Sequence, residues 1–189
     1  KRIVIFASGS GTNAENIIKY FQKNNLAEVT LVLSNKIDAK VLDRAKFFSI
    51  PSESFNKSEL MNSDRITAIL RKESPDLIVL AGFLLKFPEF ILKAFPNKVI
   101  NIHPALLPKY GGKGMYGMLV HESVVKNKEP ETGITIHYVN ENYDEGSIIF
   151  QKSFQLSEND TAESVASRIH ELEYEFFPKV IEEILKKDK

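Results

Sequence analysis

The stretch that decides the fold is Ile3-Val4-Ile5-Phe6-Ala7-Ser8-Gly9-Ser10-Gly11-Thr12-Asn13. Its first five residues form a continuous apolar run, which is typical of a strand buried on both faces of a parallel sheet. Glycines and small polar residues follow and predict a tight turn. The next apolar residues recur at helical spacing, and they are Ala14, Ile17, Ile18 and Phe21. The segment therefore predicts a strand, a turn and a helix in direct succession.

The same alternation continues through the first half of the chain. We expect buried strands at 29–33, 77–81 and 99–102, and helices at 39–47, at 66–70 and at 88–95. Ser63 or Asp64 is the expected cap of the middle helix. Residues 50–62 show no clear periodicity and are expected to be irregular. Strands that alternate with helices indicate an α/β fold with a doubly wound, mainly parallel sheet.

The pattern changes in the last third of the chain. Segments 133–139 and 147–151 read as strands with only a polar turn between them, which predicts an antiparallel pair. A long helix should follow, with Asp160 as its cap and Glu163 three residues on. Its apolar residues are Val165, Ala166, Ile169, Leu172, Phe176, Val180, Ile184 and Leu185, and Pro178 is expected to kink it. No composition shift marks a boundary, so residues 1–189 are expected to form a single domain.

The composition argues against several classes of protein. The 25 basic and 25 acidic residues cancel, so the net charge favours neither nucleic acid nor an anionic membrane as a partner. The absence of cysteine excludes disulfides and thiolate metal sites, and it fits a cytoplasmic protein. No apolar run approaches the roughly 20 residues that span a bilayer. Lys1 is expected to follow a missing initiator Met, without a signal peptide.

Residues 9–13 are a candidate anion-binding loop. Glycine lets the backbone approach a ligand, and the first turn of a helix offers unpaired N–H groups to an anion. The dinucleotide fingerprint is incomplete, because Ala14 and Glu15 stand where its third glycine would be. No acidic residue ends the second strand to hold a ribose. A single phosphate is therefore the expected ligand, and a turn without any ligand is the alternative.

The strongest catalytic signal lies in Val99-Ile100-Asn101-Ile102-His103-Pro104-Ala105-Leu106-Leu107-Pro108. Asn101 and His103 end a strand and point to the same side of it, because side chains alternate with a period of two. Open α/β sheets bind ligands at the carboxyl ends of their strands. An amide that can stabilise an oxyanion, beside an imidazole that can move protons, indicates acyl-type transfer.

The remaining histidines carry weaker signals. His121 is expected at the surface or in packing, His137 in the core or behind the site, and His170 on the last helix. No two histidines have the local spacing of a zinc site, so no metal is expected. Asp144 lies in an acidic turn, and such a turn is ordinarily exposed to solvent. If folding brings it against His103, it would orient the ring and favour its charged form.

Together, these motifs resemble the phosphoribosylglycinamide formyltransferase family. The resemblance rests on Gly9-Ser10-Gly11-Thr12-Asn13, Asn101-x-His103-Pro104-x-Leu106-Leu107-Pro108 and Asp144-x-Gly146, in this order and spacing. It covers essentially the whole chain. It implies the formyltransferase fold, a Rossmann-like sheet with antiparallel C-terminal strands and a long C-terminal helix. Residues 1–100 would bind the phosphate and the ribonucleotide, and residues 101–189 would bind folate and carry the catalytic residues.

The resemblance implies an enzyme of purine biosynthesis. Its co-substrate would be 10-formyltetrahydrofolate, and the formyl group would pass to the amine of N1-(5-phospho-D-ribosyl)glycinamide, here called the ribonucleotide. The amine would attack directly, through a tetrahedral intermediate. The partners would be these small molecules, with no metal, nucleic acid or membrane. The enzyme would be cytoplasmic, and a monomer or a homodimer.

The resemblance also assigns roles to residues. His103 would transfer protons, Asn101 would stabilise the oxyanion, and Asp144 would tune His103 and order water. The ribonucleotide would be bound by Gly9, Ser10, Gly11, Thr12, Asn13, His170 and Glu173. Folate would be bound by Leu84, Leu85, Lys86, Phe87, Asn101, Asn140, Glu141, Asn142, Tyr143 and Asp144. The glycine-rich segment 110–118 is a candidate mobile lid.

Two positions depart from the family pattern, and other functions stay open. Ser58 and Leu85 stand where arginines are common, and Lys57 is the candidate replacement for the first.

A formyltetrahydrofolate hydrolase would use a similar core with water as the nucleophile, although such enzymes carry an added N-terminal domain. A nucleotide-binding module would bind without turnover. A methionyl-tRNA formyltransferase is disfavoured, because it would need a C-terminal extension and a basic surface.

Overall fold

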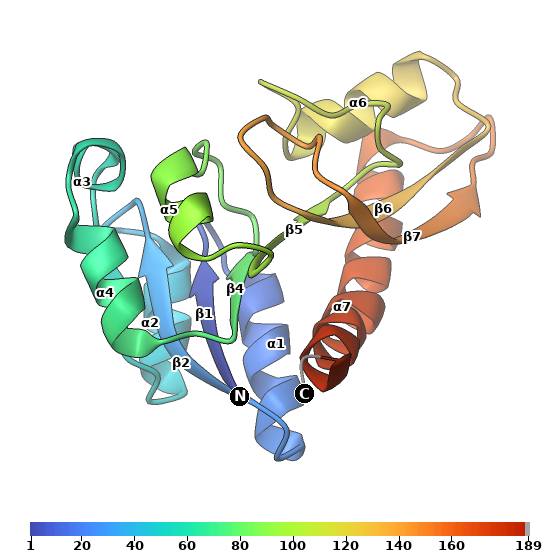
Figure 1. Ribbon diagram of the computed structural model, residues 1–189. Coiled ribbons are helices and arrows are strands. Elements are labelled where there is room, and N and C mark those ends of the chain that lie inside the picture. Colours follow the sequence, from blue (N-terminus) through green and yellow to red (C-terminus); the bar gives the residue numbers. More distant parts are fainter. Residues whose placement is uncertain (188–189) are drawn as a thin grey trace.

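Seven strands form one sheet in the order β3-β2-β1-β4-β5-β6-β7 in the computed structural model, which describes residues 1–187 (Figure 1). They are β1 (Arg2–Phe6), β2 (Glu28–Ser34), β3 (Ser52–Ser54), β4 (Leu77–Leu80), β5 (Val99–His103), β6 (Glu131–Tyr138) and β7 (Ile148–Gln155). The first five strands pair in parallel, whereas β6 runs antiparallel to both β5 and β7. The predicted sheet, with its antiparallel C-terminal strands, is thereby confirmed.

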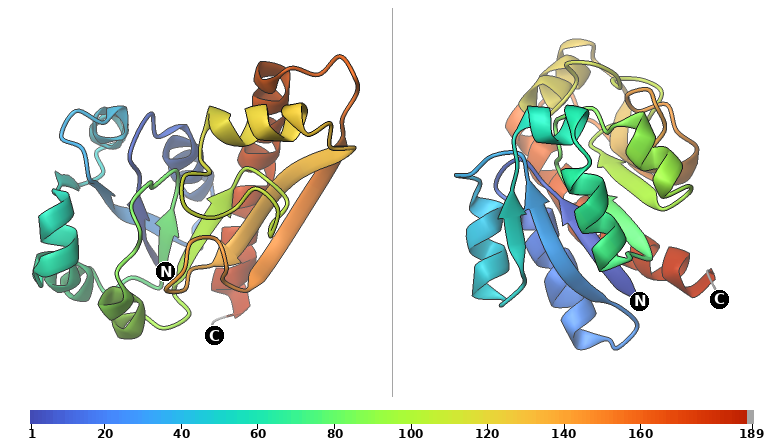
Figure 2. Two further views of the ribbon diagram at one scale, coloured as in Figure 1. Left: turned by 90° about the horizontal axis from the view of Figure 1, so that it is seen from above. Right: turned by 60° about the vertical axis from the view of Figure 1, so that its left-hand side comes forward.

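Helices cover both faces of this sheet (Figure 2). They are α1 (Thr12–Lys23), α2 (Lys40–Phe47), α3 (Lys57–Asn62), α4 (Arg65–Glu73), α5 (Glu89–Ala94), α6 (Met118–Lys126) and α7 (Ala162–Lys187). One core packs α1, α2 and α7 against the face that carries Ile3 and Ile5. The other packs α3, α4 and α5 against the face that carries Val4 and Phe6. Alternate residues of β1 thus enter different cores, as a strand buried on both faces requires.

The expectation of irregular structure at 50–62 is wrong, because this region contains β3 and α3. A capping box starts α3: the Glu59 N–H donates to Asn56 Oδ1 at 2.9 Å, and the Asn56 N–H donates to Glu59 Oε2 at 2.8 Å. That signature is readable in sequence. The strand has only three residues, 52–54. This is too short for a period of two to stand out.

The helix caps match the expectation only in part. Asp64 is the N-cap of α4, but its side chain makes no capping hydrogen bond. At the start of α7 the Ser164 N–H donates to Thr161 Oγ1 at 3.2 Å, and the Thr161 N–H donates to Ser164 Oγ at 3.0 Å. Asp160, the predicted cap, instead accepts from the Ser164 hydroxyl at 2.8 Å. Pro178 lies inside α7, which continues as one helix on both sides of it.

The order of the strands determines where a ligand can bind. Chain connections diverge between β1 and its neighbour β4, which is the switch point at which doubly wound sheets form their crevice. Aromatic packing fixes the segment after β4, because the Phe6 ring meets the rings of Phe83 and Phe87 edge-on, with centroids 5.4 and 5.2 Å apart. The Leu84 N–H also donates to Ser8 Oγ at 2.9 Å. The segments that follow β1 and β4 are thus held together.

Gly11 makes the turn before α1 possible. Its φ is +74°, and a Cβ added there would lie 2.5 Å from the Cβ of Val41. We expect Gly11→Ala to lower the free energy of unfolding by about 1–3 kcal/mol, because it adds left-handed backbone strain to overpacking. Urea unfolding measures the change. Gly9→Ala is the matched control, since a Cβ there meets nothing within 4 Å. Equal losses in both variants would contradict the steric account.

Candidate active site

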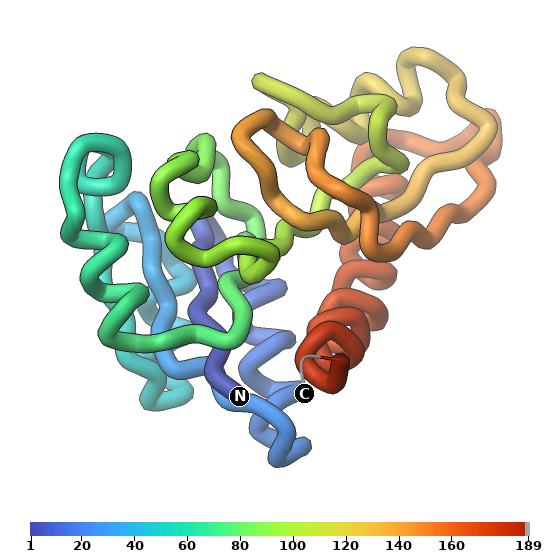
Figure 3. The backbone as a smooth tube through the Cα atoms, in the orientation of Figure 1, coloured from blue at the N-terminus to red at the C-terminus, as the bar shows by residue number. Residues whose placement is uncertain are grey.

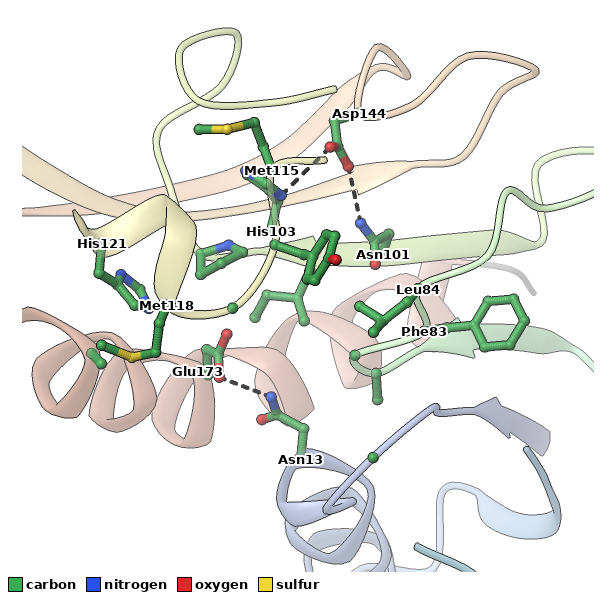
Figure 4. Close-up of a pocket in the computed structure, with 18 of the residues that line it drawn as sticks. Asn13, Phe83, Leu84, Asn101, His103, Met115, Met118, His121, Asp144 and Glu173 are labelled. Carbon is green, nitrogen blue, oxygen red and sulfur yellow. Dashed lines mark hydrogen bonds and ion pairs between the residues drawn. The ribbon is translucent and has the colours of Figure 1, made fainter. Parts of the chain in front are cut away.

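A cavity of about 690 Å³ opens at the carboxyl edge of the sheet (Figure 4). Its walls come from the segments after β1, β4 and β5, from the glycine-rich segment 112–118, and from α6 and α7. The predicted site residues that line it are Gly9, Ser10, Gly11, Thr12, Asn13, Leu84, Asn101, His103, Tyr143, Asp144, His170 and Glu173. The fold therefore brings the predicted catalytic residues and the predicted ribonucleotide-binding residues into one space.

A smaller cavity of about 50 Å³ shares Asn101, Tyr143 and Asp144 with the first. The other predicted folate residues that line it are Leu85, Lys86, Phe87, Asn140 and Asn142. The side chain of Phe87 is buried against Phe6, so a ligand here would meet mainly backbone at that position. Glu141 belongs to the same turn but lines neither of these cavities.

Asp144 links the catalytic candidates to the segment that covers them. Its Oδ2 accepts from the Gly112 N–H at 2.9 Å and lies 3.6 Å from His103 Nδ1. The backbone tube shows the 140–146 turn beside the segment that follows β5 (Figure 3). Burial raises the pKa of Asp144, but hydrogen bonds and the neighbouring histidines outweigh burial and leave this pKa below its ordinary value. Asp144 is therefore an ionised carboxylate 3.6 Å from His103 Nδ1, an arrangement that would let it orient the ring.

His103 is held through its other ring nitrogen. Nε2 lies 2.7 Å from the carbonyl oxygen of Tyr110. Because a carbonyl can only accept, Nε2 carries the proton and Nδ1 faces Asp144. Burial lowers the pKa of His103 below its ordinary value of 6.5, and Asp144 offsets this only in part. The expected support of the charged form by Asp144 is present, but burial outweighs it, so the ring is neutral at neutral pH.

Asn101 is oriented by His137, which is 2 % exposed. His137 Nδ1 lies 2.8 Å from the Tyr138 carbonyl oxygen and donates to it, which leaves Nε2 as an acceptor. Asn101 Nδ2 donates to that Nε2 at 3.1 Å and reaches Asp144 Oδ1 only at 3.5 Å. Figure 4 shows the contacts of Asp144 with Asn101 and His103. His137 is thus a residue behind the site, one of the two roles expected for it.

Sequence reasoning missed the residues that hold the turn after His103. Thr135 lies opposite His103 in the β5–β6 register, and Gln151 lies opposite Thr135 in the next pair. Thr135 Oγ1 donates to the Ala105 carbonyl at 2.7 Å and accepts from the Leu107 N–H at 3.0 Å. Gln151 Nε2 donates to Thr135 Oγ1 at 2.9 Å and to the Leu107 carbonyl at 3.0 Å. Thr135, a polar residue between the buried Ile134 and Ile136, was the available signal, whereas Gln151 lies in a largely polar strand.

Glu173 organises the opposite end of the large cavity. Its Oε2 accepts from Asn13 Nδ2 at 2.9 Å and from His170 Nδ1 at 3.0 Å, although the residue is only 6 % exposed. The hydrogen bond with Glu173 raises the pKa of His170. Arg44 braces the loop that begins α1, because its Nε donates to the Ser10 carbonyl at 2.7 Å. The start of α1 and a buried carboxylate therefore border the same part of the cavity.

Three further expectations can be placed. His121 is not at the surface: it is 3 % exposed on α6 and lines the large cavity. Ser58 and Lys57 lie on α3 and line neither of the two cavities, whereas Leu85 lines the smaller one.

Residues 1–187 contain no group of three or more His, Cys, Asp or Glu side chains that could hold a metal ion. No helix in the same residues has the length and apolar character needed to cross a membrane.

Comparison with known proteins places the chain among formyl transferases, whose family pattern matches residues 1–181. It is 38% identical to phosphoribosylglycinamide formyltransferase of Bacillus subtilis (strain 168), over 98% of this chain and 95% of that protein. The chloroplastic phosphoribosylglycinamide formyltransferase of Arabidopsis thaliana is 36% identical, and this chain spans 64% of its length. The crystal structure of the Bacillus halodurans phosphoribosylglycinamide formyltransferase superposes with a TM-score of 0.88 at 35% identity, covering 100% of this chain and 97% of that one.

Removing the Asp144 charge tests the electrostatics of the site. Asp144→Asn should lower the pKa of His103 further below 6.5, because it removes the carboxylate that raises this pKa. NMR titration of the His103 ring in both proteins measures the shift. Glu145→Gln, in the same turn but exposed, is the matched control and should change nothing. An unchanged or higher pKa in Asp144→Asn would refute the assigned coupling.

Proposed function

The chain belongs to the formyl transferase family, and on that premise we propose that it is a phosphoribosylglycinamide formyltransferase. It transfers the formyl group of 10-formyltetrahydrofolate to the amine of the ribonucleotide, a step of purine biosynthesis. One observation carries the proposal: Asn101, His103 and Asp144 meet in a cavity that residues 9–13 also line. The names of the relatives agree with this reading.

The ribonucleotide lies between residues 9–13 and His103. Its phosphate binds at the start of α1, where first-turn N–H groups and the helix dipole favour an anion. Glu173 and His170, which are joined by a hydrogen bond of 3.0 Å, contact the sugar side of the molecule. The amine then extends to the Nδ1 side of His103. The span of the large cavity supports this order of groups.

Folate lies along the segment 84–87 and the 140–144 turn. Both border the smaller cavity, and both reach the catalytic residues through Asn101 and Asp144. The buried ring of Phe87 supports recognition through backbone groups rather than through that side chain. The formyl group carried on N10 then points toward Asn101.

The proposed division of the chain into halves is therefore not strict. Residues 1–100 supply the loop at 9–13, and residues 101–189 supply Asn101, His103 and Asp144. Segment 84–87 of the first half serves folate, however, and Glu173 of the second half serves the ribonucleotide. Each subsite is thus built from both halves, which places the reacting groups where the halves meet.

The chemistry begins with a neutral amine. The amine nitrogen attacks the formyl carbon, and the carbonyl electron pair moves to oxygen. Asn101 can donate an N–H to this oxyanion, because only its 3.5 Å contact with Asp144 has to be given up while His137 keeps the amide in place. A donor of this kind is worth about 3 kcal/mol of barrier.

Proton transfer then uses the free nitrogen of His103. Nδ1 accepts the proton that leaves the attacking nitrogen, and the imidazolium is stabilised by Asp144 Oδ2, 3.6 Å away. The proton passes to N10 of the folate, directly or through a water held by Asp144. The bond between carbon and N10 breaks, which leaves the formylated ribonucleotide and tetrahydrofolate. Such general acid–base help is worth about 10²–10⁴ in rate.

The setting of the enzyme is a separate part of the proposal. We place it in the cytoplasm as a monomer or a homodimer that binds only small molecules. Two plant relatives are named chloroplastic, so the compartment differs among relatives. Light scattering of the purified protein gives the oligomeric state.

The decisive assay follows release of the deformylated folate with and without the ribonucleotide. A formyltransferase releases it only when the ribonucleotide is present. Release without the ribonucleotide would support the hydrolase alternative, and binding without release would support a non-catalytic module. Either result would overturn the proposed function.

Variants in the same assay assign the chemistry to residues. His103→Ala and Asp144→Asn should each lower kcat about 10²–10⁴-fold while circular dichroism shows an intact fold. Glu145→Gln, which changes an exposed carboxylate of the same turn, should keep the wild-type rate. Wild-type rates in either catalytic variant would refute its role.

A further inference from the structure

His121 is a buried polar residue that the mechanism above does not use. It lies on α6, is 3 % exposed and lines the large cavity beside Met118 (Figure 4). Its Nδ1 atom is buried without a hydrogen-bond partner. A buried polar atom that lacks a hydrogen-bond partner costs stability, because it has lost its hydrogen bonds to water. For this reason about 90% or more of buried polar atoms in proteins are hydrogen-bonded.

His137 shows how a structural histidine is satisfied in this fold. It is as buried as His121, yet Nδ1 lies 2.8 Å from the Tyr138 carbonyl and Nε2 lies 3.1 Å from Asn101 Nδ2. Protein groups therefore use both of its nitrogens. His121 has no such arrangement at Nδ1, which distinguishes it from a histidine kept for packing.

A second unpartnered atom belongs to Asn13, which lines the same cavity. Asn13 Oδ1 is buried without a partner, although Asn13 Nδ2 donates to Glu173 at 2.9 Å. Within residues 1–187, the other unpartnered buried side-chain atoms are the hydroxyls of Thr30 and Thr67, and neither residue lines either cavity. Two residues that line one cavity thus each carry an unpartnered polar atom, which points to the polar groups of a ligand.

The surroundings of His121 limit what that ligand group can be. Burial lowers the pKa of His121. The nearby His170 and His103 lower this pKa further, and only Glu173 raises it. The ring is therefore neutral at neutral pH, so one nitrogen donates and the other accepts. A hydroxyl, which also donates and accepts, matches such a ring. A dianionic phosphate would instead be matched by a cationic side chain at this position.

We infer that His121 hydrogen-bonds a ribose hydroxyl of the ribonucleotide and so positions it for attack. This inference rests on the proposed function. With the phosphate at residues 9–13 and the amine at His103, the sugar has to occupy the part of the cavity between them. His121, Asn13 and Glu173 line the cavity from α6, α1 and α7. The sugar would thus be held from three helices.

The test compares His121→Phe with wild type. Phenylalanine keeps an aromatic ring and removes both nitrogens, so we expect the KM for the ribonucleotide to rise about 10-fold. The KM for 10-formyltetrahydrofolate should stay within about twofold. His121→Asn, whose amide can reach the position of Nδ1, should recover part of the loss. A histidine kept only for packing would give both variants a lower Tm and the same change in both KM values.

Deoxy analogues identify the hydroxyl. Calorimetry with the 2′-deoxy and the 3′-deoxy ribonucleotide should find one analogue that wild type and His121→Phe bind equally well, because the partner of His121 is then missing from both complexes. If His121→Phe weakens the binding of both analogues as much as it weakens the binding of the full ribonucleotide, the inference fails.

The controls separate this inference from the function it rests on. Thr67→Val removes an unpartnered buried hydroxyl on α4, away from both cavities, and should leave both KM values unchanged. A wild-type enzyme without ribonucleotide-dependent turnover would overturn the proposed function and the inference with it. An active wild type with an unchanged ribonucleotide KM in His121→Phe would overturn the inference alone.

Discussion

The buried carboxylate of Asp144 is the constraint on which the site depends. It accepts from the Gly112 N–H at 2.9 Å and lies 3.6 Å from nitrogens of both His103 and His137. A carboxylate that is only 12 % exposed is costly unless it is paired and hydrogen-bonded. The Gly112 N–H and the 3.5 Å contact with Asn101 Nδ2 offset that cost, and they fix the turn after β6 against β5 and the segment that follows it. Removing the charge would therefore disturb the position of that segment and the surroundings of His103.

The mixed sheet explains how such a site can form. Parallel strands β1 and β4 place their loops at the switch point, which gives a crevice where the phosphate and folate are proposed to bind. Antiparallel β6 ends beside Ile100, near the start of β5, and the turn that follows it folds back to bring Asp144 to Asn101 and His103. The strand order thus supplies the crevice, and the turn after β6 supplies the carboxylate that is proposed to assist catalysis.

Much of this could be predicted from local pattern. Continuous apolar runs such as 3–7 marked the parallel strands, and the pair Asn101 and His103 marked the strand end that borders the cavity. What escaped prediction depends on tertiary contact. His121 looks like any histidine on a helix until α6 packs beside the cavity, and the neutral state of His103 results from burial that no local pattern displays. The short strand at 52–54 and the polar braces Thr135 and Gln151 likewise acquire meaning only through their neighbours.

The central claim is that His103 is a neutral base whose Nε2 is tied to the Tyr110 carbonyl and whose Nδ1 faces Asp144 and the substrate. Long-range ¹H–¹⁵N NMR of the His103 ring at neutral pH tests it most directly, because the two nitrogens report their protonation separately. The account predicts a ring that is protonated at Nε2 and free at Nδ1. A ring protonated at Nδ1 alone, or at both nitrogens, would contradict it.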